Sequence, residues 1–181
     1  MAKSDQDHWD DKYRRGQGEY PPSLPERFVP FADMFRARTS GIELACGAGA
    51  VTVWLAQQGV QMAAYDISPV AVAAATELAE KHGVADRATI CVADLDGGLP
   101  DGDRVDLIVC NLFRDARLDQ AVMARLRPGG MLAVAALSEV GAVPGRFRVA
   151  EGALVSAFAA LQPVASHEAD GVAWLVATKS G

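Results

Sequence analysis

From residue 40 onward, short apolar segments alternate with segments of helical pattern, and this alternation constrains the fold more than any other feature. Strands that alternate with helices form βαβ units with right-handed crossovers and a parallel sheet covered by helices on both faces. We therefore predict an α/β fold, a doubly wound and mostly parallel sheet. Its seven expected strands are GIELAC, QMAAYD, ATICVAD, RVDLIVCNL, MLAVAAL, PVASHE and VAWLVATK.

Turn and capping residues support this reading. Ser68 suits an N-cap, Pro69 the first helical position and Gly83 a helix end, which predicts a helix over residues 68–83. Asp170-Gly171 suits a tight hairpin turn, so the closing hairpin adds one antiparallel strand. The other helices are expected at residues 50–59, 117–126 and 150–160.

The chain of 181 residues is expected to be a single domain, with an N-terminal helical cap segment over residues 1–38 and a core over 39–181. Trp9 and Tyr13 are four residues apart and share one helical face. A helix near residues 25–35 is expected to lead into the core.

Composition narrows the classes of partner. A net charge of −6 gives no general reason to expect nucleic acid or an anionic membrane as a partner. No apolar stretch is long enough to cross a bilayer, and the first residues lack a signal-peptide pattern. The three cysteines have no metal-type spacing and are expected to be buried in a reducing cytoplasm, with no metal site. Oligomeric state is not indicated.

A glycine turn after the first strand and acids at three strands suggest a ligand site. Gly47 and Gly49 allow the backbone to approach a ligand at the carboxyl end of the sheet. Asp66 is placed to accept hydrogen bonds from ribose hydroxyls, and Asp94 from the exocyclic amine of a base. Glu43 is better suited to a positively charged ligand than to a pyrophosphate, which indicates a cationic nucleoside.

A nicotinamide-dependent oxidoreductase on the same fold is the first alternative. Its fingerprint needs a third glycine, and this chain has Thr52 at that position. A binding module without turnover is the second alternative, because no convincing general base is found.

Five segments stand in order along the chain: IELACGAGA, AYDIS, VADL, VDLIVCNL and LRPGGMLAVAA. Together they resemble the class I S-adenosylmethionine-dependent methyltransferases, and the two ends of the chain resemble the small bacterial tellurite-resistance type. The resemblance implies a Rossmann-like fold and S-adenosylmethionine as cofactor, with S-adenosylhomocysteine as product. We expect a cytoplasmic enzyme with a small-molecule acceptor, because the core fold uses most of the chain and the net charge is negative. The implied cofactor-binding residues are Glu43, Ala45, Cys46, Gly47, Gly49, Asp66, Ile67, Asp94, Leu95 and Asn111.

Catalytic residues are harder to assign. Arg114 stands where relatives have a histidine, which favours an anionic acceptor such as a thiolate or a chalcogen oxyanion that needs no base. Arg114, His8 and Tyr13 are the catalytic candidates. Trp9, Tyr13, Phe113 and Arg114 are the candidates for binding the acceptor.

Overall fold

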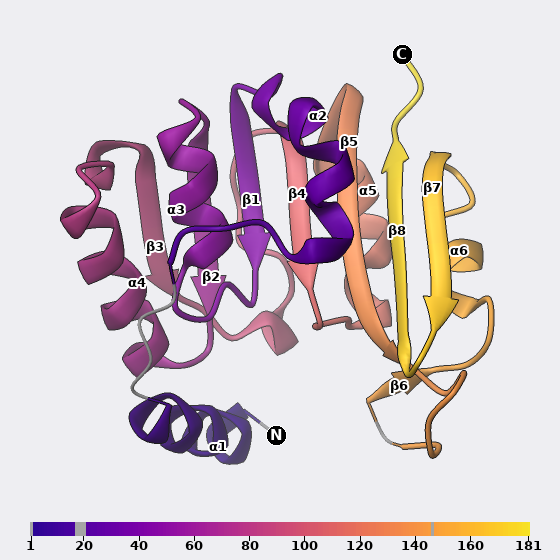
Figure 1. Ribbon diagram of the computed structural model, residues 1–181, viewed down its shortest axis with the longest axis horizontal. Coiled ribbons are helices and arrows are strands. Elements are labelled where there is room, and N and C mark those ends of the chain that lie inside the picture. Colours follow the sequence, from indigo (N-terminus) through magenta and orange to yellow (C-terminus); the bar gives the residue numbers. More distant parts are fainter. Residues whose placement is uncertain (1, 17–20, 146) are drawn as a thin grey trace. The chain divides into compact units, whose positions relative to one another are not determined.

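Three parallel strands in the order β3–β2–β1 form the sheet of the first unit, residues 1–100. The computed structural model describes residues 2–16, 21–145 and 147–181, and its second compact unit is residues 101–181 (Figure 1). The elements of the first unit are α1 (Ala2–Arg15), η1 (Glu26–Phe31), α2 (Ala32–Arg36), β1 (Ser40–Leu44), α3 (Ala50–Gln57), β2 (Gln61–Asp66), α4 (Pro69–Lys81), η2 (Ala85–Arg87), β3 (Ala88–Val92) and η3 (Leu95–Gly97).

Helices α3 and α4 lie against this sheet, and their apolar faces form its core. Val53, Ala56, Ala79 and Val84 make one buried cluster. The predicted cap of α4 is confirmed: the Ser68 hydroxyl accepts a hydrogen bond from the Ala71 amide at 3.1 Å, and Pro69 begins the helix. A capping side chain satisfies one of the amides that a helix leaves unpaired at its start.

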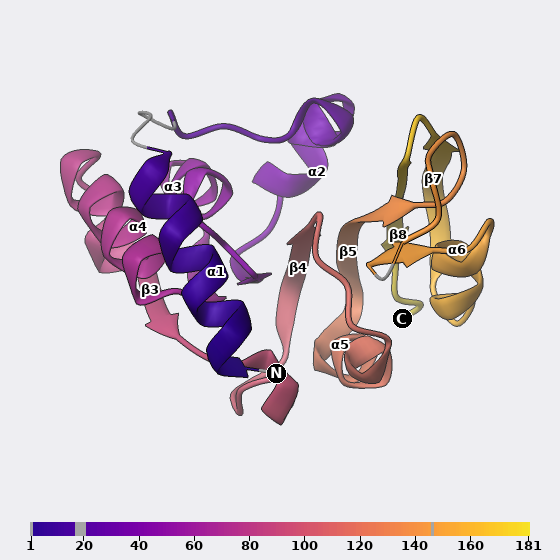
Figure 2. The same ribbon diagram turned by 90° about the horizontal axis from the view of Figure 1, so that it is seen from below.

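Helix α1 packs beside the start of α4, at the end of the unit where β1 and β2 finish (Figures 1 and 2). Leu44 on β1 pairs in register with Tyr65 on β2, so the two strands end side by side. The residues that follow them therefore meet beneath α1. This arrangement positions the candidate site.

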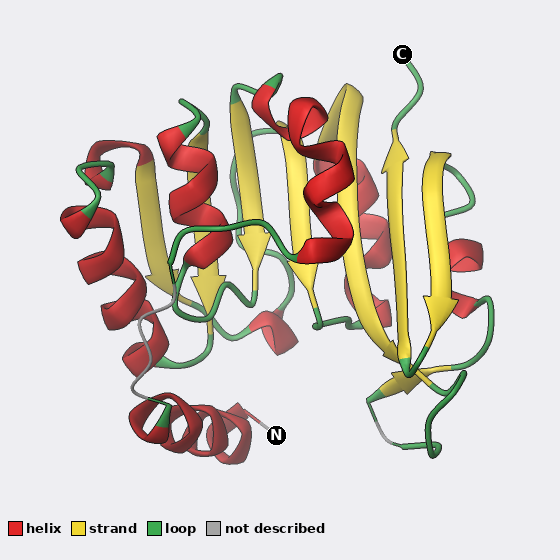
Figure 3. Cartoon of the chain, viewed as in Figure 1, coloured by secondary structure: helices red, strands yellow, loops and turns green. Residues whose placement is uncertain are grey.

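The second unit contains a mixed sheet in the order β4–β5–β8–β7, in which β8 runs antiparallel to both of its neighbours and β6 pairs with β5 (Figure 3). Asp170 and Gly171 have φ of 51° and 79°, so the predicted hairpin turn is confirmed. The elements are β4 (Val105–Asn111), η4 (Ala116–Leu118), α5 (Asp119–Arg125), β5 (Leu126–Ser138), β6 (Arg148–Val149), α6 (Ala153–Ala157), β7 (Gln162–Ala169) and β8 (Val172–Thr178).

Some boundaries differ from the prediction. The described residues form eight strands rather than seven, because the backbone at Arg148 and Val149 pairs with the end of β5. Helix α6 is shorter than the predicted 150–160, since Gly152 precedes it in a left-handed conformation and the last turn does not stay helical. No helix in the described part of the chain has the length and hydropathy needed to cross a membrane.

Candidate functional site

The turn after β1 is built from backbone conformations that favour glycine. Gly47 and Gly49 have φ of 53° and 79°, and Ala45 also has a positive φ of 53°. A non-glycine residue in this region is uncommon and carries strain, which is typical of functional turns. The Cys46 amide donates to the Tyr65 carbonyl oxygen at 3.0 Å, so the turn remains attached to the end of β2.

The space beside each glycine is taken by the protein itself. A Cβ on Gly47 would overlap the Tyr13 hydroxyl oxygen, and a Cβ on Gly49 would lie 2.7 Å from the Ala75 Cβ. Gly49 therefore lets α4 approach the turn closely. Gly47 lets α1 bring a hydroxyl group against the turn.

Asp66 ends β2 and is tied directly to the glycine turn. One carboxylate oxygen accepts from the Gly47 amide at 2.8 Å, and the other accepts from the Ser68 amide at 2.9 Å. The residue is only 6% exposed, and burial raises the pKa of Asp66 although these amides oppose the shift. The structure thus brings Gly47 and Asp66 together at the carboxyl ends of two paired strands.

Glu43 and Thr52 form a buried pair beneath the same turn. The Thr52 hydroxyl donates to a Glu43 carboxylate oxygen at 2.5 Å. Burial raises the pKa of Glu43 from 4.5 to about 8, with a smaller contribution from the charge of Asp66. Glu43 therefore holds a proton for most of the time at neutral pH in this environment. Thr52 stands where the nicotinamide-binding fingerprint has its third glycine, and here its hydroxyl is the hydrogen-bond donor to Glu43.

The third strand contributes an exposed acid and a buried apolar residue. Asp94 accepts from the Asp96 amide at 2.9 Å and caps the short helix η3. Leu95 is 7% exposed, and Ile67 is half-buried after β2. These positions fit a base-binding wall, and their role stays a prediction.

Three residues predicted to bind the cofactor or the acceptor, Asn111, Phe113 and Arg114, lie in the second unit. Asn111 is the last residue of β4, and Leu112 follows in a left-handed conformation with φ of 60°. The Phe113 carbonyl oxygen accepts from the Cys110 thiol at 2.8 Å. Arg114 pairs with Asp119 at 2.6 Å, which offsets its positive charge. The buried Arg114 Nε has no hydrogen-bond partner in the described part of the chain.

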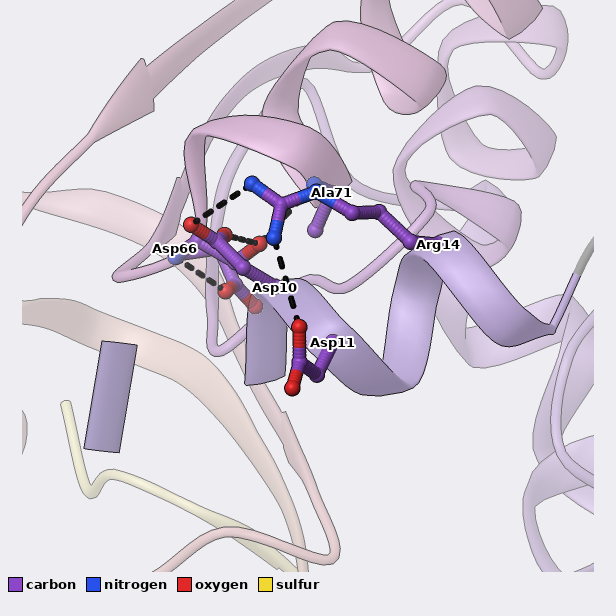
Figure 4. A network of polar contacts seen from close by, with 6 residues as sticks. Asp10, Asp11, Arg14, Asp66 and Ala71 are labelled. Carbon is purple, nitrogen blue, oxygen red and sulfur yellow. Dashed lines mark hydrogen bonds and ion pairs between the residues drawn. The ribbon is translucent and has the colours of Figure 1, made fainter. Parts of the chain in front are cut away.

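Helix α1 carries the candidates His8, Trp9 and Tyr13. It also carries Asp10, a buried acid that the sequence analysis did not identify. Trp9 and Tyr13 share a face as predicted, with ring centroids 6.3 Å apart, and the exposed His8 stands edge-on to Trp9. Asp10 is only 6% exposed and accepts from the Ser68 hydroxyl at 2.5 Å. Figure 4 shows Asp10 reaching from α1 toward Asp66 and the start of α4.

The cysteines follow the prediction in two of three cases. Cys46 and Cys110 are buried, and burial raises the pKa of the Cys46 thiol well above its usual value. Cys91 is exposed, so the prediction is wrong there, because β3 has one open edge in the first unit's sheet. Within residues 2–16, 21–145 and 147–181, no three His, Cys, Asp or Glu side chains gather to hold a metal ion.

Comparison with known proteins adds the family context. The family described as "Methyltransferase domain" matches residues 42–130. The chain is 37% identical to ribosomal RNA small subunit methyltransferase C of Alcanivorax borkumensis, over 55% of this chain, and spans about a third (32%) of that relative.

Two solved structures show the same fold. One is TehB from Haemophilus influenzae, with a TM-score of 0.78, 18% identity and coverage of 97% of this chain and 67% of that one. Another is magnesium protoporphyrin IX methyltransferase of Synechocystis PCC 6803, a structure with bound S-adenosylhomocysteine. Its TM-score is 0.72 at 16% identity, over 99% of this chain and 100% of that one.

Proposed function

Because the chain belongs to the class I S-adenosylmethionine-dependent methyltransferase superfamily, we propose that it transfers a methyl group from S-adenosylmethionine to a small-molecule acceptor. The observation that carries the proposal is the pairing of Asp66 with the Gly47 turn. It joins a carboxylate suited to ribose hydroxyls with a glycine turn whose backbone is proposed to contact the methionine end of the cofactor.

The residues of the first unit fit this cofactor. Each carboxylate oxygen of Asp66 accepts one backbone amide, and a carboxylate oxygen has lone pairs for a second donor such as a ribose hydroxyl. We propose Asp94 and Leu95, which follow β3, for the adenine, and Ile67, which follows β2, for one face of the ring. Asn111 of the second unit is proposed for the methionine end by resemblance alone.

When bound, the cofactor supplies an electrophilic methyl group on a sulfonium, and the protein has to orient it. Holding two reactants in the correct orientation can lower the activation barrier of such a displacement by roughly 7–11 kcal/mol. Two groups of the chain are poorly suited to proton transfer or attack: the pKa of the Cys46 thiol is well above its usual value, and Arg114 pairs with Asp119. Because these two groups do not serve as a base and the sequence contains no convincing general base, we infer that the acceptor arrives as a deprotonated nucleophile, such as a thiolate or a chalcogen oxyanion.

The curated relative is named for ribosomal RNA, so RNA is the acceptor class to test against small molecules. The net charge of −6 favours the small-molecule class, because phosphate contacts require clustered Lys and Arg. The acceptor assay is release of S-adenosylhomocysteine across thiols, chalcogen oxyanions, phenols, amines and 16S ribosomal RNA. Turnover with the RNA and none of the small molecules would contradict the proposed acceptor class.

Cofactor binding is tested separately by calorimetry with S-adenosylhomocysteine. Asp66→Ala is expected to weaken the affinity by about 1.5–3 kcal/mol, the range for hydrogen bonds to a charged group. Asp86→Ala is the matched control, since Asp86 is an exposed acid of the same unit whose ion-pair partner is Arg87. Equal affinities for the folded Asp66→Ala variant and the control would place the ribose elsewhere.

A further inference from the structure

Helix α1 is held to the rest of the first unit by a buried polar contact. Asp10 is 6% exposed and Ser68 is fully buried, and their side chains form a hydrogen bond of 2.5 Å across 58 residues of sequence. Trp9, the largest side chain of the helix, remains 38% exposed. A buried carboxylate requires a hydrogen-bond partner, so this contact specifies where α1 rests.

This contact holds α1 over the two groups that the proposed function requires. Asp66 lies two residues before Ser68 and is only 6% exposed. The Tyr13 hydroxyl, one turn after Asp10, stands where a Cβ of Gly47 would be. A nucleoside that hydrogen-bonds to Asp66 and lies against Gly47 needs both surfaces open. In the conformation described here, α1 covers them.

The start of α4 strengthens the contact. The Ser68 hydroxyl donates to Asp10 and accepts from the Ala71 amide at 3.1 Å, so it links the carboxylate to the first turn of a 13-residue helix. Negative charge is favoured near a helix N-terminus. On the other side, Arg14 lies 3.8 Å from Asp10 and 3.3 Å from Asp11 (Figure 4). Asp10 thus joins two segments that are far apart in the sequence.

We propose that Asp10 is a positioning residue whose hydrogen bond with Ser68, here called the α1 latch, has to break before the cofactor reaches Asp66 and Gly47. This inference rests on the function proposed above.

Rapid-mixing kinetics with S-adenosylhomocysteine test the latch. Trp9 provides the fluorescence signal, because its ring lies 4.3 Å from the Lys12 ammonium and 6.3 Å from the Tyr13 ring, and a Trp9→Phe variant identifies its share of the total. If opening precedes binding, the observed rate levels off at the opening rate as ligand concentration rises. Asp10→Ala is expected to raise this limiting rate by at least about tenfold and to lower the apparent dissociation constant, with the release rate unchanged, because the latch closes only the cofactor-free protein.

Asp11→Ala is the matched control. It removes the same charge from the neighbouring position of the same helix, yet Asp11 is exposed and pairs with Arg14 and Arg15. This variant is expected to keep the wild-type rates. Asp10→Asn keeps the shape and an acceptor oxygen, and is expected to give rates between those of the wild type and Asp10→Ala. It also serves as the test variant if Asp10→Ala does not fold.

A double variant separates the latch from general stability. Ser68→Ala lowers stability through the lost cap of α4, so folding of each variant is checked by circular dichroism. If one hydrogen bond limits opening, Asp10→Ala combined with Ser68→Ala opens no faster than the faster single variant. Rates in Asp10→Ala and Asp10→Asn equal to the wild type, with cofactor still bound, would overturn the latch. Failure of the wild-type protein to bind S-adenosylhomocysteine at all would overturn the proposed function instead.

Discussion

Replacing Glu43 by glutamine should remove a pH dependence of folding that the buried turn creates. Glu43 is 3% exposed and accepts from the Thr52 hydroxyl, and its pKa is raised from 4.5 to about 8 by burial. Glutamine has the same shape and offers an oxygen to Thr52 without carrying a charge. The substitution therefore removes the ionisation and keeps the hydrogen bond.

The raised pKa of Glu43 determines how the free energy of unfolding changes with pH. A group that holds its proton more tightly in the folded protein contributes stability below its unfolded pKa, and this contribution is lost as the pH rises through the folded value. For Glu43 the window runs from 4.5 to about 8. At 1.36 kcal/mol for each tenfold change, the loss across this window reaches about 5 kcal/mol at most.

Urea denaturation followed by circular dichroism at pH 5, 7 and 8.5 measures this effect. The free energies of unfolding of wild type and Glu43→Gln are expected to be similar at pH 5. At pH 8.5 the variant is expected to be more stable by several kcal/mol, within the limit of about 5 kcal/mol. Glu80→Gln is the control, because it makes the same substitution at an exposed position of α4 and leaves Glu43 in place, so the pH dependence caused by Glu43 is expected to persist. Parallel pH profiles for wild type and Glu43→Gln would refute the reasoning.

Two further predictions concern the same turn. If the cationic end of S-adenosylmethionine pairs with the Glu43 carboxylate, binding at pH 7 is expected to release nearly one proton per chain, because Glu43 is mostly protonated before binding. Calorimetry in buffers of different ionisation enthalpy measures this release, and Glu43→Gln is expected to abolish it. Equal release by both proteins would show that Glu43 is not the source of the proton. Gly49→Ala is expected to lower the free energy of unfolding by about 2–5 kcal/mol, because it adds left-handed strain and a Cβ that lies 2.7 Å from the Ala75 Cβ. Combining it with Ala75→Gly should recover part of this loss in a double-mutant cycle, and strictly additive costs would contradict the overlap.

Local signals in the sequence predicted much of the fold. The Ser68 cap, the Asp170-Gly171 hairpin and strand β2 were predicted because each depends on residues close in sequence. The two-residue strand β6 was missed, since its pairing with β5 depends on how the intervening loop returns to the sheet. The exposure of Cys91 likewise depends on which strand is left at an edge.

The candidate site shows the same division. Asp66 and the Gly47 turn were predicted to belong to one ligand site because parallel strands present their carboxyl ends at one edge of the sheet. Asp10 was missed because nothing in the sequence distinguishes it from Asp7 and Asp11, which are exposed acids of the same helix. Only the packing of α1 against the rest of the unit buries Asp10. The hydrogen bond between Glu43 and Thr52 could have been predicted from the sequence. Glu43 is an unexpected acid on the first strand, Thr52 replaces the third glycine of the fingerprint, and both residues belong to one strand–turn–helix segment.

A crystal structure of the protein with S-adenosylhomocysteine tests the central claim most directly. The account predicts ribose hydroxyls within hydrogen-bond distance of the Asp66 carboxylate and the homocysteine end against the backbone of Gly47. A nucleoside bound away from both residues would contradict it.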